Sequence, residues 1–187
     1  TYQTPEKENL TIKDRLMLDS RIYFTLKYAN TVLRWRKLAK RKKYDTTAWA
    51  DSSYYIFRFI EKAGGRFNIA GLENIIKPEG PVLFISNHMS TLETMIFPCI
   101  IAPNRELTFV VKESLTRHPL FKDVMLSRNP VVVGRSDPRK DLEAVMNGGA
   151  ELLSKGISLV IFPQSTRNLE FKPEDFNSLG VKLAKKA

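Results

Sequence analysis

The chain has 187 residues, 43% hydrophobic and 27% charged, a composition typical of a globular domain with a substantial core. The single cysteine, Cys99, excludes a disulfide framework within the chain, and no stretch approaches the ~18 apolar residues of a spanning helix. The net charge of +10 is uneven: residues 1–63 carry 14 basic and 7 acidic side chains, and residues 64–187 carry 16 and 13. A basic end on a nearly balanced body indicates an anionic partner, either nucleic acid or membrane lipid.

Residues 1–63 are predicted to form a basic, aromatic arm of two amphipathic helices. Apolar residues recur at a mostly helical spacing over 10–38, and a second helical segment covers about 46–63. Aromatic side chains crowd into both segments, and seven basic residues lie between Arg34 and Lys43. This mixture is typical of helices that lie in a bilayer interface. We therefore expect a membrane-associated protein on the cytoplasmic face; the alternative is a helical pair packed on the domain with a solvated charged face.

Residues 64–187 alternate short β-rich runs with longer helical segments. The predicted strands are "RFNIAG", "PVLFIS", "LTFVV", "NPVVVG" and "SLVIF". Helical segments are expected at 90–101, 113–127, 138–155 and from about 175. This alternation predicts an α/β domain, a mostly parallel sheet flanked by helices. In such sheets, ligands bind at the carboxyl ends of the strands.

Polar side chains follow four of these strands at their carboxyl ends. They are His88 and Glu93, then Lys112, then Arg135, and finally Ser165, Thr166 and Arg167. This set suits general-base chemistry beside an anionic, phosphorylated substrate, because it combines one histidine, one carboxylate, two hydroxyls and three cations at the same edge of the sheet. Taken singly, each of the cations has an alternative interpretation as ordinary surface charge.

The stretch "NHMSTLE", residues 87–93, places a glutamate five positions after a histidine. If a helix begins just after His88, Glu93 can reach back to the Nδ1 atom and fix the tautomer while Nε2 takes a proton. A histidine that merely closes a strand, with Glu93 on a solvated turn, is the alternative. His118 has no acidic partner at a catalytic spacing, so we predict a structural or surface role for it. Cys99 lies in an apolar run and is predicted to be a buried, unreactive thiol.

Three ordered blocks resemble those of the PlsC-type 1-acylglycerol-3-phosphate acyltransferases, the glycerolipid and lysophospholipid acyltransferase family. "NHMSTLE" is similar to the family's His-x₄-Asp block, and "FPQSTRN" (162–168) is similar to its "FPEGTRS" block. Between them, "VKESLTRHPLF…NPVVVGRSDP" resembles the family's second block. The resemblance covers about residues 66–187, and three blocks in one α/β frame are far more specific than any single one.

The resemblance implies that His88 deprotonates the free hydroxyl of a lysophospholipid, most simply 1-acylglycerol-3-phosphate, which becomes phosphatidic acid. The hydroxyl oxygen would attack the thioester of acyl-CoA or acyl-carrier protein, with no metal or other cofactor. Glu93 would take the place of the family's aspartate as the residue that orients His88. The acceptor's phosphate would be held by Arg167, Thr166, Ser165, Lys112 and Arg135.

The sequence departs from the family at several positions. Glutamate replaces aspartate at 93, Gln164 and Ser165 replace the usual Glu-Gly, and Lys122 replaces a glycine. The family continues beyond "VKLAKKA" into a further strand, so we expect the sheet to be truncated at its C-terminus. These departures leave open another lysophospholipid acceptor or a non-catalytic lipid-binding relative. A nucleic-acid binder is the less favoured alternative, because the sequence contains no recognised nucleic-acid motif.

Overall fold

The computed structural model describes residues 1–5, 21–164 and 166–187 of the chain. Its centre is a four-stranded parallel sheet in the order β3-β6-β4-β5. The strands are β3 (Leu83–Ile85), β4 (Leu107–Lys112), β5 (Val131–Val133) and β6 (Ser158–Ile161). β6 pairs with both β3 and β4, so the last strand in the chain lies inside the sheet. The prediction of an α/β fold with a mostly parallel sheet is confirmed.

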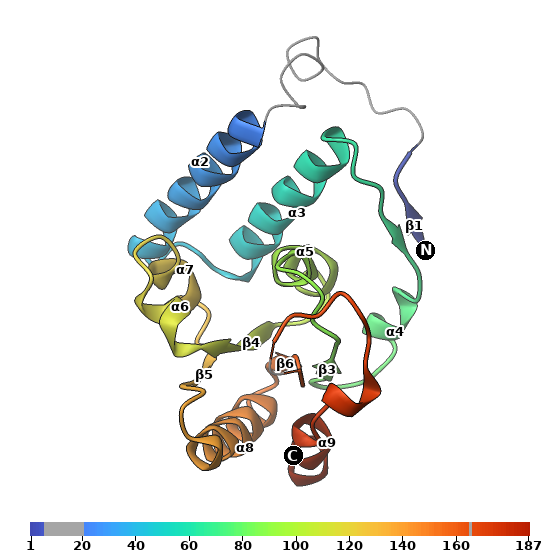
Figure 1. Cartoon of the computed structure of the whole chain (residues 1–187), viewed down its shortest axis with the longest axis vertical. Helices are drawn as coiled ribbons and strands as arrows, with labels where there is room; N and C mark the ends of the chain where they lie inside the picture. The colour runs from blue at the N-terminus through green and yellow to red at the C-terminus, as the bar shows by residue number, and fades with distance from the viewer. Residues whose placement is uncertain (6–20, 165) are drawn as a thin grey trace.

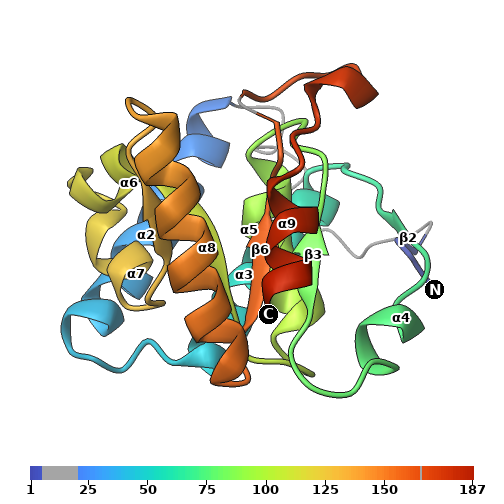
Figure 2. The same cartoon turned by 90° about the horizontal axis from the view of Figure 1, so that it is seen from below.

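Helices cover both faces of this sheet (Figures 1 and 2). One face carries α2 (Arg21–Lys40), α3 (Thr46–Lys62) and α5 (Leu92–Ile101), and the other carries α8 (Pro138–Ser154) and α9 (Leu179–Lys186). The crossover from β4 to β5 contains α6 (Glu113–Arg117) and α7 (Lys122–Leu126), and the short α4 (Glu73–Ile76) precedes β3. The helical cover explains why the two central strands, β4 and β6, read as continuous apolar runs, because both of their faces are largely buried.

Several element boundaries differ from those expected. The first part of the helix predicted at 10–38 lies outside the described residues, and α2 extends to Lys40. The helical region expected at 113–127 is interrupted at His118, because the following proline excludes the helical conformation there and His118 has extended backbone angles. The last helix begins at Leu179, after a 3₁₀ turn, η1 (Pro173–Asp175).

A separate two-stranded antiparallel sheet joins β1 (Tyr2–Gln3) to β2 (Asn68–Ile69), which lies within the predicted strand "RFNIAG". The buried carboxylate of Glu61 stabilises this sheet. It accepts hydrogen bonds of 2.6 Å from the hydroxyls of Tyr2 and Thr4 and forms an ion pair of 2.6 Å with Arg58. The run therefore forms a strand outside the main sheet.

The core continues across residue 64, the predicted boundary between the arm and the α/β domain. α3 packs along α5, and the ring of Trp49 meets that of Phe109 of β4 edge-on at 5.5 Å. One cluster of buried residues combines Ala39, Tyr44, Trp49, Ile101, Leu107, Phe109 and Val160. The second helix of the arm thus holds in place the helix that carries Glu93. Its association with membranes stays a prediction.

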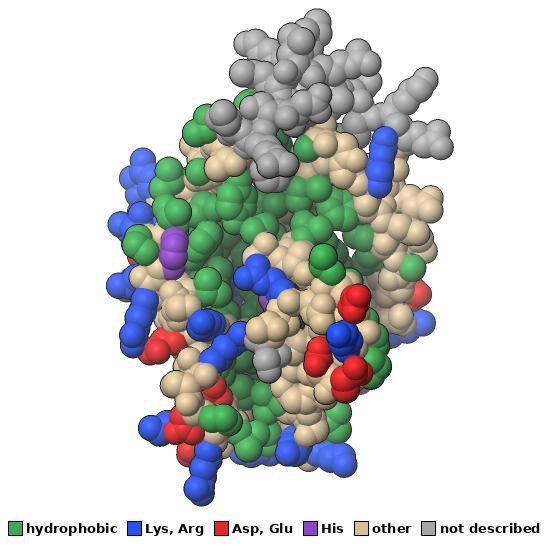
Figure 3. All heavy atoms as spheres, viewed as in Figure 1, with side chains coloured by type: hydrophobic (Ala, Val, Ile, Leu, Met, Phe, Trp, Pro, Cys, Tyr) green, Lys and Arg blue, Asp and Glu red, His purple; other side chains and the backbone are tan. Residues whose placement is uncertain are grey.

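Among the described helices, none combines the length and the apolar character needed to cross a bilayer. On the face shown in Figure 3, hydrophobic side chains gather over α2, α3 and α5. Lys and Arg side chains border this apolar area on its left and lower sides.

The N-cap of α3 is predicted to contribute to the stability of the folded protein. The Asp45 carboxylate caps α3 by accepting a hydrogen bond of 2.8 Å from the Ala48 N–H. We expect Asp45→Ala to lower the free energy of unfolding by about 1 kcal/mol, the usual cost of losing such a cap. Asp51→Ala, an equal charge change at an exposed position of the same helix, is the control in thermal unfolding. Equal destabilisation by the two variants would show that the cap has no special role.

Candidate active site

The carboxyl ends of the four parallel strands bring the predicted site residues to one edge of the sheet. His88 follows β3 by three residues, Lys112 ends β4, Arg135 follows β5 by two residues, and Arg167 follows β6 by six. Because parallel strands end at the same edge, residues far apart in the sequence converge there. The structure confirms this arrangement for the backbone of all four segments.

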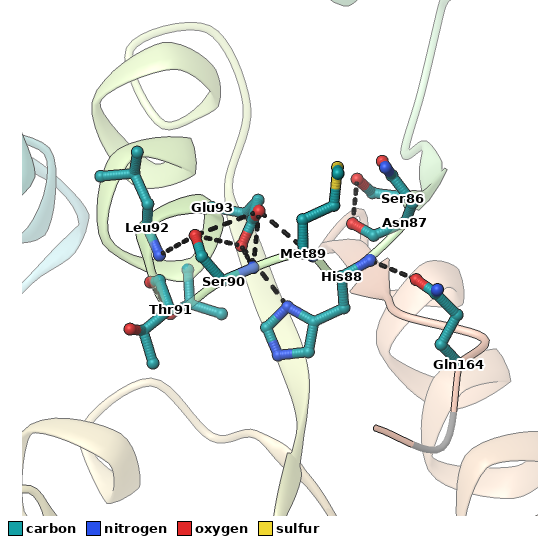
Figure 4. Close-up of polar contacts among 10 residues, drawn as sticks. Ser86, Asn87, His88, Met89, Ser90, Thr91, Leu92, Glu93 and Gln164 are labelled. Atoms are coloured by element: carbon teal, nitrogen blue, oxygen red, sulfur yellow. Dashed lines mark hydrogen bonds and ion pairs between the residues drawn. The ribbon is translucent and has the colours of Figure 1, made fainter. Parts of the chain in front are cut away.

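His88 and Glu93 face one another across the turn between β3 and α5 (Figure 4). The distance from His88 Nδ1 to Glu93 Oε2 is 3.5 Å, and both side chains are mostly buried, with 15% and 19% of their surface exposed. This distance is that of an ion pair and is longer than a normal hydrogen bond. The imidazole therefore presents Nδ1 to the carboxylate, as the His-x₄-Glu spacing predicted.

The position of Glu93 is fixed by the first turn of α5. Its carboxylate accepts hydrogen bonds from the backbone N–H of Ser90, at 3.0 and 3.1 Å, and from that of Met89, at 3.3 Å. In return the Ser90 hydroxyl accepts a hydrogen bond of 2.9 Å from the Leu92 N–H. The glutamate half of this pattern is that of a capping box, while the Ser90 hydroxyl bonds one residue earlier than in the standard motif. The sequence signal Ser-x-x-Glu was present in "STLE" and could have identified Ser90 as a supporting residue.

Gln164 braces the backbone of His88 from the neighbouring strand β6. Its Oε1 atom accepts a hydrogen bond of 2.5 Å from the His88 N–H, across 76 residues of sequence (Figure 4). The His88 carbonyl in turn accepts a hydrogen bond of 3.0 Å from the Asn168 N–H. The imidazole stacks on Phe162, with ring centroids 4.3 Å apart. His88 is thus held on three sides by the segment that follows β6.

The pKa of His88 is lowered from its ordinary value of 6.5. Burial of the imidazole is the main cause, because it disfavours the charged form, while the carboxylate of Glu93 acts in the opposite direction. The positive charges of Arg167 and Arg135 lower the pKa further. A lowered pKa keeps the imidazole neutral at pH 7, the form in which it can accept a proton.

The five residues predicted to hold phosphate are not equally placed. Arg167 and Arg135 lie close enough to His88 for their charges to act on it. Lys112 and Thr166 are exposed, and in the described part of the chain neither forms a hydrogen bond or an ion pair with the other site residues. Ser165 lies outside the described residues. The roles assigned to these side chains stay predictions.

Of the two side chains assigned no catalytic role, His118 lies at the surface as predicted, whereas Cys99, predicted to be buried, is only partly buried. His118 is exposed, and its ring lies tilted against that of Phe121, with centroids 5.0 Å apart. Burial raises the pKa of the Cys99 thiol, which disfavours the reactive thiolate. Over residues 1–5, 21–164 and 166–187, no three His, Cys, Asp or Glu side chains gather in a way that could hold a metal ion.

Comparison with known proteins identifies the family of the chain. A family model described as "Acyltransferase" matches residues 66–187. The chain belongs to the acyltransferase family. The matched range contains the whole parallel sheet and every predicted site residue, and it agrees with the extent of the resemblance seen in the three sequence blocks.

Relatives within the acyltransferase family carry one recurrent name. The chain is 32% identical over 144 residues to the 1-acyl-sn-glycerol-3-phosphate acyltransferase of Pseudomonas aeruginosa, a match that covers 77% of this chain and 53% of that protein. It is 29% identical over 138 residues to a chloroplastic 1-acyl-sn-glycerol-3-phosphate acyltransferase of Arabidopsis thaliana, with coverages of 74% and 36%. The chain therefore spans about half or less of the length of these curated relatives.

Among solved acyltransferase structures, the chain resembles PlsC, the 1-acyl-sn-glycerophosphate acyltransferase of Thermotoga maritima. The TM-score is 0.60 at 21% identity, and the match covers 94% of this chain and 70% of that one. At this level of identity the likeness concerns the fold. It shows that the helices before residue 66, as well as the sheet, follow an arrangement seen in a solved acyltransferase.

Proposed function

We propose that this acyltransferase moves a fatty acyl group from a thioester donor to the free hydroxyl of a lysophospholipid, with 1-acyl-sn-glycerol-3-phosphate as the acceptor and phosphatidic acid as the product. The observation that carries the proposal is the facing pair of His88 and Glu93 at the carboxyl edge of the sheet. The names of the relatives from Pseudomonas aeruginosa and Arabidopsis thaliana support this acceptor.

In the proposed mechanism, the Nδ1 atom of His88 carries the proton that faces Glu93, which leaves the Nε2 lone pair free. Nε2 removes the proton of the acceptor's hydroxyl as its oxygen bonds to the thioester carbonyl carbon. The carbon–sulfur bond then breaks, and the imidazolium returns the proton to the departing thiolate. The negative charge of Glu93 stabilises the imidazolium formed between these two steps.

The acceptor's phosphate is proposed to bind at the cations beside His88. Arg167 and Arg135 are the first candidates, because their charges already act on the imidazole. An arginine fork can form two parallel hydrogen bonds with phosphate oxygens. Thr166, Ser165 and Lys112 are proposed to complete the site. A phosphate bound here would place the adjoining glycerol hydroxyl near Nε2.

The acyl donor is proposed to be acyl-CoA or acyl-carrier protein. A thioester is already activated toward attack by an oxygen nucleophile, so the proposed reaction needs no metal and no organic cofactor. His88 and the charges that face it suffice for the proton transfers.

The proposed mechanism predicts a specific pH dependence. Because the active form has a neutral His88, kcat/KM should rise with pH through the pKa of the free enzyme. Since that pKa is lowered, the midpoint of the acid limb should lie below 6.5. Arg167→Gln removes a charge that lowers the pKa, so it should move the midpoint upward. Profiles recorded from about pH 5 to 8 test this; a midpoint that stays in place or moves downward in Arg167→Gln contradicts it.

The proposed function is tested by an acyl-transfer assay of the full chain with labelled acyl-CoA or acyl-carrier protein. The acceptors are 1-acyl-sn-glycerol-3-phosphate, lysophosphatidylcholine and glycerol 3-phosphate. We expect the first to be acylated fastest. Preference for lysophosphatidylcholine would replace the proposed acceptor with another lysophospholipid. Lipid binding without turnover of any acceptor would favour the non-catalytic relative and overturn the proposed function.

We also propose that the basic, aromatic arm binds an anionic membrane surface, at the cytoplasmic face, and thereby brings the site to its lipid acceptor. Exposed Leu26 and Leu33 on α2 and exposed Tyr54 and Tyr55 on α3 supply apolar surface. The adjoining cluster between Arg34 and Lys43 supplies positive charge, worth roughly 1 kcal/mol per side chain near an anionic leaflet.

Co-sedimentation with anionic and zwitterionic vesicles tests the membrane proposal. The double variant Lys40→Glu with Arg41→Glu should lose binding to anionic vesicles. The control variant Lys182→Glu with Lys185→Glu makes the same charge change on exposed α9 residues and should keep it. If the two double variants bind anionic vesicles equally well, the arm is not the membrane-binding element.

A further inference from the structure

The turn that follows β5 is held by a single carboxylate. Asp141, in the first turn of α8, accepts a hydrogen bond of 2.8 Å from the Gly134 N–H through Oδ1. Its Oδ2 atom accepts another of 2.8 Å from the Arg135 N–H. Both oxygens of Asp141 are therefore used to fix two consecutive backbone groups of the segment that carries Arg135.

The backbone of Arg135 has an unusual conformation. Its φ angle is +63°, in the left-handed region that residues with a β-carbon rarely adopt. Glycine is the residue that most readily adopts such an angle. Here the neighbouring Gly134 has no positive φ, and the angle falls on the arginine instead. An arginine in this conformation needs surrounding contacts that hold it there, and the two hydrogen bonds that Asp141 accepts from the backbone supply them.

The direction in which a side chain leaves the backbone is set by the backbone angles at that residue. Holding Arg135 in the left-handed conformation therefore sets the direction of its Cα–Cβ bond and limits the positions that its guanidinium can reach. The guanidinium lies near enough to His88 for its charge to act on the imidazole. Among the described residues, the other charged groups that act on His88 are the Glu93 carboxylate and the Arg167 guanidinium, so Arg135 is one of two described cations in this environment.

We propose that Asp141 is a positioning residue: by binding the N–H groups of Gly134 and Arg135, it directs the Arg135 guanidinium toward His88 and the acceptor's phosphate. The assignment of phosphate to Arg135 rests on the proposed function. The placement of Arg135 beside His88 is independent of the proposed function. The positioning role of Asp141 and the proposed function can therefore be tested separately.

The test uses the imidazole of His88 as a reporter. The chain contains only two histidines, so NMR titration of the full chain gives two sets of imidazole signals. Asp141→Ala releases the turn, and the pKa of His88 should rise because a cation moves away. Asp137→Ala is the matched control, because Asp137 also accepts two backbone hydrogen bonds at the start of α8, from Arg139 and Lys140. We expect it to destabilise the helix without raising the pKa of His88.

The sign of the shift separates positioning from simple charge loss. Each variant removes one negative charge, which by itself can only lower the pKa of an imidazole. A pKa of His88 that falls or stays unchanged in Asp141→Ala therefore overturns the proposal. If Asp141→Ala does not fold, Asp141→Asn, which keeps one acceptor oxygen, is titrated in its place with the same criterion.

A double-mutant cycle completes the experiment. Arg135→Gln should itself raise the pKa of His88, and adding Asp141→Ala should then produce no further rise, because the group on which Asp141 acts is gone. In the acyl-transfer assay, Asp141→Ala should raise the KM for 1-acyl-sn-glycerol-3-phosphate about tenfold, the effect of weakening one charge-assisted hydrogen bond. The pKa of His88 could rise in Asp141→Ala although the wild type transfers no acyl group; this result would support the positioning role and contradict the proposed function. If Asp141→Ala raises the pKa of His88 by the same amount in the Arg135→Gln background as in the wild type, the positioning role itself is contradicted.

Discussion

Replacing His88 by alanine is expected to lower kcat for acyl transfer by roughly 10²–10⁴-fold, the usual contribution of a positioned general base. No described side chain can take its place, because the nearest carboxylate, Glu93, lies on the Nδ1 side of the ring and is bound to the first turn of α5. The KM values should change little, because the imidazole is proposed to act on the proton and not to bind the phosphate. Single-turnover assays with labelled donor provide the measurement.

His118→Ala is the matched control, since it removes the chain's other histidine, at an exposed position. It should leave kcat within twofold of the wild type, as expected for a substitution at an exposed position without a proposed catalytic role. His88→Ala also loses the contact with Phe162, so circular dichroism must show that it is folded. A folded His88→Ala that retains the wild-type kcat would exclude His88 as the base.

Glu93→Gln is expected to lower kcat by roughly 10²-fold, because the charge that stabilises the imidazolium is removed. A glutamine can still accept the hydrogen bonds from the first turn of α5, so the start of the helix should survive. The pKa of His88 should fall further, since Glu93 is the group that raises it. Measurement of kcat together with the NMR titration of His88 tests both consequences.

Glu93→Asp is the comparison that separates charge from length. It keeps the carboxylate and restores the family's usual residue, so it should retain more activity than Glu93→Gln. Its carboxylate would start from a contact that is already 3.5 Å long, so some loss is expected. Greater activity in Glu93→Gln than in Glu93→Asp would contradict the role of Glu93 in orienting and stabilising His88.

The sequence was sufficient to predict the main sheet because its strands are short apolar runs that alternate with helical segments, and the central ones, β4 and β6, are buried on both faces. Runs such as "LTFVV" and "SLVIF" therefore stand out as short apolar stretches. The strand β1 was missed because two residues carry no period-two pattern. The hydroxyls in and beside it donate hydrogen bonds to Glu61, which lies about 60 residues away in the sequence. The break at His118 had a local signal in Pro119, but the helical period on both sides of it hid the interruption.

The site was predictable as far as strand ends and local spacing determine it. The pairing of His88 with Glu93 needs only a helix that starts just after the histidine, so the spacing permitted it. The polar residues at the other strand ends and the family resemblance were needed to favour it over a histidine that merely closes a strand. The brace from Gln164 depends on the strand order, which puts β6 beside β3 and which the sequence does not state. The sequence showed Gln164 only as a departure near the phosphate site. The left-handed angle of Arg135 was equally hidden, because it depends on a carboxylate in the next helix.

The position of β6 has a consequence for how the protein is made. A ribosome releases β3, β4 and β5 before β6, yet β6 is the strand that hydrogen-bonds to both β3 and β4. Until residues 158–161 emerge, the nascent chain has two unpaired strand edges, which are prone to wrong pairing. His88 is synthesised 76 residues before the glutamine that braces it. Translation must therefore pass residue 164 before the surroundings of the imidazole can be completed, so the candidate site cannot form while the first strands of the sheet are being synthesised.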